Sequence, residues 1–75
     1  MSENSELILK GKQFLENQNY EQALSYFEQA LLLDQNNPDL MNLKGTALRS
    51  MGRYEEAVEC FNKSLEIDPR DKNSS

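Results

Sequence analysis

Apolar residues recur along this chain with the period of an α-helix. In the stretch 20–34 they stand at spacings of three and four residues, and the stretch 54–68 repeats that pattern. Residues at these spacings share one face of a helix, whereas a half-buried strand needs alternation by two, which no long part of the chain shows. The stretches 4–17 and 38–51 carry narrower apolar stripes of the same period. The pattern therefore predicts an all-α chain with four helices near 4–17, 20–34, 38–51 and 54–68.

The ends of these helices coincide with residues that cap or break helices. Asn37 followed by Pro38 is typical of an N-cap with proline in the first helical position, and Asn19 is the expected N-cap of the second helix. Gly52 suits the end of the third helix and Pro69 the end of the fourth. All three connections are short, so consecutive helices are expected to be antiparallel neighbours.

The two halves of the chain repeat each other at one constant offset, the one that aligns Gly11 with Gly45. The same offset aligns three further pairs of identical residues, Tyr20 with Tyr54, Ala23 with Ala57, and Phe27 with Phe61. An offset one residue longer or shorter aligns none of these pairs. The sequence therefore divides into one unit at 4–37 and a second at 38–71, with flexible termini expected at 1–3 and 72–75.

The small residues of each unit indicate close helix packing. Glycine inside a helix is about 1 kcal/mol less favourable than alanine, so Gly11 and Gly45 predict a close approach of a second helix. We expect the facing residues to be Ala23 and Ala57, which lets each pair approach at the short end of the usual distance. The tyrosines and phenylalanines of the stripes are then expected to fill the space between one hairpin and the next. The full set of predicted packing residues is Gly11, Tyr20, Ala23, Phe27, Gly45, Tyr54, Ala57, Phe61 and Pro69.

These residues at this spacing resemble the tetratricopeptide repeat, a family whose repeat is about 34 residues long. The segments 54–57 (YEEA) and 65–69 (LEIDP) are especially typical of that family. The departures are Leu7 and Met41 at the family's tryptophan position, and Lys10 and Lys44 at the apolar position before each glycine. The resemblance implies an α-solenoid, in which antiparallel helix pairs stack into a right-handed superhelix.

The resemblance also implies a scaffold for protein–protein interaction. In such arrays the first helix of each unit lines a concave groove that holds a peptide or a segment of a partner protein. Carried onto this chain, the groove residues are Ser5, Ile8, Lys12, Leu15 and Glu16 from the first helix, and Asp39, Asn42, Thr46, Arg49 and Ser50 from the third. The carboxylate clamp of chaperone-binding members is not matched, because Ile8, Lys12 and Leu43 stand where its first lysine and its asparagines belong.

The small number of units leaves two alternatives open. Arrays of this kind usually need about three units to bury a continuous core, and apolar residues stand at both ends of this chain, in the segments 7–9 and 58–67. These faces could meet between copies, giving a self-associating unit that forms a dimer or a head-to-tail superhelical assembly. The other alternative is a fragment of a longer array. A homo-oligomer or part of such an array is therefore expected, with a protein or peptide as the partner.

The composition narrows the chemistry further. The chain has thirteen acidic and eight basic residues, a net charge of −5, no histidine, no tryptophan and one cysteine. A dedicated nucleic-acid binder carries a basic face, so no nucleic acid is expected as a partner, and no apolar stretch reaches the length of a membrane span. Cys60 has no histidine to activate it. We therefore predict no catalytic, cofactor-binding or metal-binding residue and no enzyme activity, and a lone reduced thiol favours a cytoplasmic location.

Overall fold

The computed structural model describes residues 3–67, and within that range it contains four α-helices and no strand. The helices are α1 (Glu3–Glu16), α2 (Tyr20–Leu33), α3 (Pro38–Ser50) and α4 (Tyr54–Ile67). The all-α prediction is confirmed, and the predicted helix bounds that fall in this range differ from the observed ones by at most one residue. Glu3, expected in a flexible terminus, is the first residue of α1. The predicted fourth-helix end at 68, Pro69 and the terminus 72–75 lie outside the described residues.

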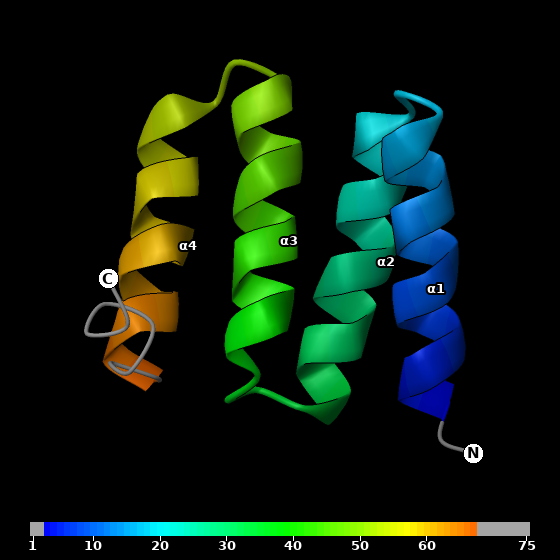
Figure 1. The fold of residues 1–75 in the computed structure, drawn as a ribbon, viewed down its shortest axis with the longest axis horizontal. Helices are drawn as coiled ribbons and strands as arrows, with labels where there is room; N and C mark the ends of the chain where they lie inside the picture. Colours follow the sequence, from blue (N-terminus) through cyan, green and yellow to red (C-terminus); the bar gives the residue numbers. More distant parts are fainter. Residues whose placement is uncertain (1–2, 68–75) are drawn as a thin grey trace.

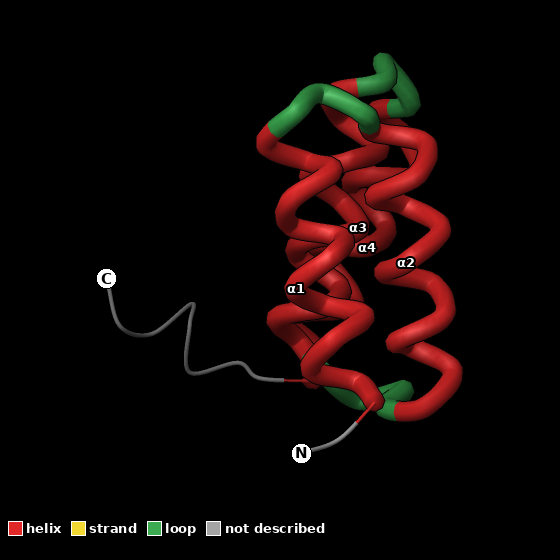
Figure 2. Tube along the Cα trace, turned by 90° about the vertical axis from the view of Figure 1, so that its right-hand side faces the viewer, coloured by secondary structure: helices red, strands yellow, loops and turns green. Residues whose placement is uncertain are grey.

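The four helices stand side by side in chain order, with α1 at one edge and α4 at the other (Figure 1). Consecutive helices run antiparallel, and the turns that join them lie at the two ends of the bundle (Figure 2). Each helix packs against the next one in the chain, and α1 also contacts α3. Consequently α2 and α3 are covered on both sides, whereas α1 and α4 each leave one side without a neighbour among the described helices.

Each hairpin turns through a residue with positive φ, 66° at Gln18 and 82° at Gly52. In the first turn the amide of Asn19 donates to the Phe14 carbonyl at 2.8 Å and that of Gln18 to Leu15 at 3.1 Å; in the second, Arg53 donates to Leu48 and Gly52 to Arg49, both at 2.9 Å. These paired bonds form a Schellman motif, which needs a left-handed residue at its centre. Gln18 and Gly52 hold equivalent positions in the two repeat units, so the two hairpins close in the same way with different residues.

Substitutions at the two turn residues are expected to change the stability of the fold in opposite directions. Gln18→Gly should stabilise the fold and Gly52→Ala should destabilise it, each by about 1 kcal/mol, because only glycine adopts positive φ without a steric cost. A Cβ on Gly52 would meet nothing within 4 Å, so the loss reflects backbone conformation alone. Urea unfolding measures both free energies, and an unchanged stability of Gly52→Ala would contradict the left-handed turn.

The two predicted asparagine caps behave differently. The Asn37 side chain accepts a hydrogen bond from the Leu40 amide at 3.2 Å, and Pro38 follows it, as predicted. Asn19 occupies the N-cap position of α2, but its side chain makes no capping hydrogen bond. Asn19 also closes the turn after α1, and its ψ of 70° differs from the extended 106° of Asn37. The short turn therefore determines the Asn19 backbone and leaves its side chain outside the cap.

Each mid-helix glycine faces a phenylalanine ring from the partner helix of its own hairpin. A Cβ built on Gly11 would lie 2.5 Å from Cε1 of Phe27, and one built on Gly45 would lie 2.8 Å from Cε1 of Phe61. The prediction that alanines are the closest facing residues is therefore wrong, as is the placement of these two rings between the hairpins. The missing side chain of the glycine makes room for an aromatic ring, which fills the inside of each hairpin.

The second unit departs from the first at two positions of its packing stripe. Tyr20 is half-buried, but its repeat equivalent Tyr54 is 65% exposed and does not fill the space between hairpins. Ser64 replaces an alanine of the first unit and is fully buried, and its hydroxyl donates to the carbonyl of Pro38 at 3.1 Å. This bond ties the last turn of α4 to the first turn of α3 and satisfies the buried hydroxyl.

Candidate functional site

The predicted groove residues lie on α1 and α3, two helices that contact each other directly. We call this the α1–α3 surface. Its half-buried members are Ile8, Leu15, Asn42 and Thr46, and its exposed members are Ser5, Lys12, Glu16, Asp39, Arg49 and Ser50. The helical period places the members from each helix on one side of that helix. The surface therefore combines half-buried apolar and polar side chains with exposed polar and charged ones.

One half-buried member of the α1–α3 surface, Asn42, carries an amide with unused hydrogen-bonding capacity. The Thr46 hydroxyl donates to the Asn42 carbonyl at 2.9 Å, one turn earlier in α3, so its hydrogen is already engaged. The side-chain amide of Asn42 makes no hydrogen bond to any residue in 3–67, although the residue is half-buried. A side-chain amide offers two donated hydrogens and an acceptor oxygen, the same groups that an extended backbone needs. The Asn42 side chain therefore has donors and an acceptor that no described residue uses.

The basic side chains of the α1–α3 surface form no ion pair within the described part of the chain. There the ion pairs are Lys44 with Glu28, at 3.7 Å, and Arg53 with Glu56, at 2.8 Å. Lys12 and Arg49 on the α1–α3 surface belong to neither pair. Both are exposed, so each can reach a carboxylate of a bound segment without losing an internal partner.

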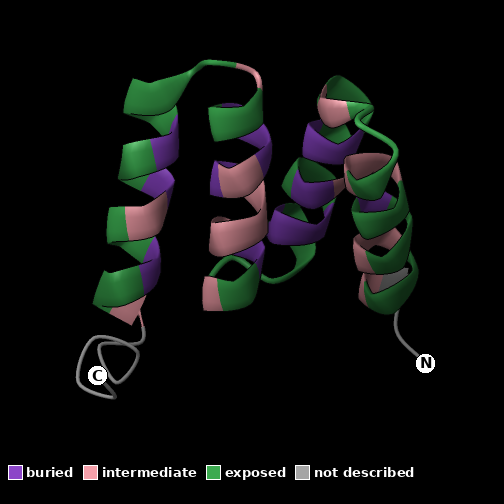
Figure 3. Cartoon of the chain, turned by 45° about the horizontal axis from the view of Figure 1, so that its top comes forward, coloured by how far each residue is buried: buried purple, intermediate pink, exposed green. Residues whose placement is uncertain are grey.

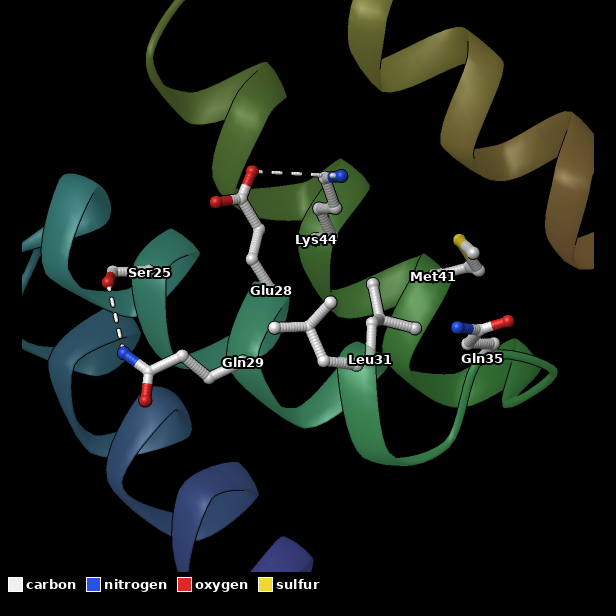
Figure 4. Close-up of a pocket in the computed structure, with 8 residues that line it drawn as sticks. Ser25, Glu28, Gln29, Leu31, Gln35, Met41 and Lys44 are labelled. Atoms are coloured by element: carbon white, nitrogen blue, oxygen red, sulfur yellow. Dashed lines mark hydrogen bonds and ion pairs between the residues drawn. The ribbon is translucent and has the colours of Figure 1, made fainter.

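A surface hollow of about 550 Å³ between α2 and α3 was missed by the sequence analysis (Figure 4). Its lining residues are Ser25, Glu28, Gln29, Leu31, Leu32, Gln35, Met41 and Lys44. The Lys44–Glu28 ion pair crosses it, and Gln29 donates a hydrogen bond to Ser25 at 3.5 Å (Figure 4). The signal that could have revealed it was Lys44 at a position where the family is usually apolar.

A second hollow of about 530 Å³ lies between α1 and α2 and is lined in part by Lys10, the repeat equivalent of Lys44. Lys44 and Thr46 are two residues apart on α3, so about 200° of helix rotation separates their directions. The hollow at Lys44 and the α1–α3 surface therefore occupy different sides of α3. They are separate features of the molecule.

Cys60 is a buried free thiol on α4. Burial raises its pKa, the nearby carboxylates of Glu59, Glu56 and Glu28 raise it further, and Lys44 opposes them. The thiol therefore stays protonated and packs as a small apolar group rather than as a nucleophile. Within residues 3–67, no three histidine, cysteine, aspartate or glutamate side chains gather closely enough to hold a metal ion.

The start of α4 carries the best-defined charged contact in the described residues. Nε and Nη2 of Arg53 donate to the two carboxylate oxygens of Glu56, both at 2.8 Å. These hydrogen bonds lower the pKa of Glu56 and raise that of Arg53. Both groups are exposed, so the contact orients the first turn of α4 rather than supporting the core.

None of the helices described here has the length and apolar character that crossing a bilayer requires.

Comparison with known proteins gives one family and several relatives. Residues 14–74 match the family described as tetratricopeptide repeat. An uncharacterized protein of Methanocaldococcus jannaschii is 46% identical over 48 residues, 64% of this chain and 56% of that protein. A TPR repeat-containing thioredoxin of Arabidopsis thaliana is 32% identical over 69 residues, 92% of this chain and 10% of that protein. Anaphase-promoting complex subunit 7 of Homo sapiens is 32% identical over 62 residues, 83% of this chain and 11% of that protein. The chain thus spans between a tenth and just over half of the length of these relatives.

Proposed function

Because the chain belongs to the tetratricopeptide repeat family, whose members are protein–protein interaction modules, we propose that it binds an extended segment of a partner protein on the α1–α3 surface. The observation that carries this proposal is the side-chain amide of Asn42, which is open to solvent and has no hydrogen-bond partner among residues 3–67. Such an amide offers two donated hydrogens and an acceptor oxygen to a ligand without breaking any internal hydrogen bond. An extended peptide supplies both donors and acceptors along its backbone.

The rest of the surface supports the same ligand. Ile8 and Leu15 from α1 are half-buried, which leaves part of each side chain for an apolar residue of the partner. Lys12 and Arg49 carry positive charge and take part in no ion pair within the described part of the chain. We therefore expect the bound segment to place an acidic residue near Lys12 and Arg49 and an apolar residue against Ile8 and Leu15.

Peptide capture by two variants tests this assignment. An array of immobilised peptides, with acidic, neutral and basic members of equal length, is incubated with the chain labelled at its N-terminus. Asn42→Ala should weaken capture about tenfold, the effect of losing one or two hydrogen bonds. The double variant Lys12→Glu and Arg49→Glu should abolish capture of the acidic peptides. Circular dichroism should show unchanged helicity in both, because none of these side chains has a hydrogen-bond or ion-pair partner within the described residues.

The matched control is Asn62→Ala, which removes an exposed asparagine from α4. It should leave both capture and stability unchanged. Capture of acidic peptides that persists in the double variant would show that the α1–α3 surface is not the binding surface. Equal losses in Asn42→Ala and Asn62→Ala would show that the effect is not local to α3.

A further inference from the structure

The outer side of α4 carries an exposed apolar stripe, whereas the equivalent stripe on α2 is buried. Leu24 and Leu31 on α2 are each 8% exposed, whereas their repeat equivalents on α4, Val58 and Leu65, are 53% and 37% exposed. We call the stripe of Tyr54, Val58 and Leu65 the α4 outer face. Figure 3 shows the buried side of α4 turned toward α3 and exposed residues along its other side.

The interface between α2 and α3 shows what kind of element covers such a stripe. Leu24 and Leu31 belong to one cluster of buried side chains with Leu40 and Ala47 of α3, both of which are 0% exposed. A helix with a small and a large aliphatic residue two turns apart therefore fits against this pattern. The α4 outer face repeats the pattern, so a helix of the α3 type fits there too.

The α1 helix of a second copy of this chain is not suited to cover the α4 outer face. The repeat equivalents of Leu40 and Ala47 on α1 are Glu6 and Gln13, and both are exposed. A head-to-tail contact would therefore place a carboxylate and an amide where α3 places aliphatic side chains. Burying unpaired polar groups in this way costs about 1–3 kcal/mol for each group. The polar outer side of α1 is thus unsuited to cover α4.

A row of carboxylates lies along one side of the α4 outer face. Glu55, Glu59 and Glu66 each follow one residue of the stripe, so the three project about 100° further around the helix. All three are exposed, and none takes part in an ion pair within residues 3–67. On α2 the equivalent positions hold one glutamate, one serine and one leucine. The acidic row is therefore a property of α4, and two copies meeting through α4 would bring their acidic rows together.

We propose that the α4 outer face binds a basic amphipathic helix of a partner protein, packed against α4 as α3 packs against α2. Aliphatic residues of that helix cover Val58 and Leu65, and lysine or arginine side chains at its edge pair with the acidic row. At the α2–α3 interface Lys44 pairs with Glu28, whose equivalent on α4 is Asn62, but it also lines one hollow with Ser25 and Leu32, whose equivalents on α4 are Glu59 and Glu66. A basic side chain at the Lys44 position of a docked helix therefore lies beside two carboxylates of the acidic row. This binding is separate from the α1–α3 surface and does not depend on it.

The α3 segment itself is the probe for this proposal. A labelled peptide of residues 37–53 has the α3 pattern and carries three basic residues and one acidic residue. Fluorescence anisotropy with the full chain should show saturable binding, with a gain of peptide helicity on binding because isolated helices of this length are marginal in water. The same peptide with Lys44→Glu and Arg49→Glu should bind at least about tenfold more weakly.

Variants of the full chain locate the binding. Val58→Ser should abolish binding of the peptide, while Leu9→Ser, at a position 57% exposed on α1, should not change it. Both side chains are more than half exposed, so neither variant should unfold the chain. Glu59→Lys combined with Glu66→Lys should weaken binding of the basic peptide and strengthen binding of the charge-reversed one. Asn42→Ala should leave binding to α4 unchanged, which separates this result from the test of the α1–α3 surface.

Three results would overturn the proposal. The first is no saturable binding of either peptide. The second is binding of the basic peptide that Val58→Ser leaves intact, since the peptide would then be replacing α3 inside the molecule. The third is a dimer of the chain alone in sedimentation equilibrium that Val58→Ser dissociates, because a second copy would then be the occupant of this face.

Discussion

Replacing Phe27 with alanine is expected to leave most molecules unfolded at room temperature. Phe27 is 0% exposed, and its ring fills the space next to Gly11. Truncation of a buried phenylalanine costs about 3–5 kcal/mol, because apolar area is lost and a cavity remains. A core of this size rarely supplies more than about 3–5 kcal/mol in total. Circular dichroism of Phe27→Ala should therefore show loss of the helical signal without denaturant.

The repeat offers a matched control in Phe61→Ala. Phe61 occupies the equivalent position of the second hairpin but is only partly buried against the core. Its loss removes less buried area, so the variant should remain folded with a lower unfolding midpoint in urea. Equal destabilisation by Phe27→Ala and Phe61→Ala would contradict the difference in burial between the two rings.

Replacing Gly11 with leucine is the second change with a large expected effect. Even the Cβ of alanine at this site would lie 2.5 Å from the Phe27 ring, closer than carbon atoms approach without displacement. Overpacking of this kind costs about 1–3 kcal/mol or more, which exceeds the gain of about 1 kcal/mol in helix propensity. Gly11→Leu should therefore destabilise the fold strongly, and Gly11→Ala should do so less. Thermal unfolding followed by circular dichroism measures both.

A double-mutant cycle isolates the contact between Gly11 and Phe27. Phe27→Leu removes part of the ring, so adding Gly11→Ala in that background should cost less than it does in the original chain. The expected coupling is about 1 kcal/mol or more, as found for residues in direct contact. Gly45→Ala should cost less than Gly11→Ala, because Phe61 is half-buried and can move. Additive effects of Gly11→Ala and Phe27→Leu would show that the two residues do not touch.

Much of the fold could be predicted because its signals are local. The angular position of each residue on a helix depends only on its place in the chain, so apolar spacing was sufficient to locate all four helices. Asn37 with Pro38 marked the start of α3 for the same reason. Gln18 was not recognised as a left-handed residue, because glutamine carries no preference for positive φ. Its role became evident from its own φ of 66° and from the two hydrogen bonds that close its turn.

The contacts between helices were harder to predict than the helices themselves. Gly11 and Gly45 correctly indicated a close approach, but spacing alone could not distinguish an alanine from a phenylalanine ring as the facing group. The hollow at Lys44 was also missed, although the lysine had been noted as a departure from an apolar position. Whether such a side chain is paired depends on the neighbouring helix, and here Glu28 of α2 is that neighbour.

The sequence by itself determined the helices, the repeat with its period, and the family, because these depend on residue identity and spacing along one chain. Only the tertiary structure decided which of two equivalent residues is buried. Leu24 and Val58 have the same position in the repeat, yet α3 packs over the first and no described helix packs over the second. Burial depends on which helix lies on each face, and that neighbour is set by the whole fold rather than by the local pattern. This difference between two equal stripes makes α4 the candidate for a second binding surface.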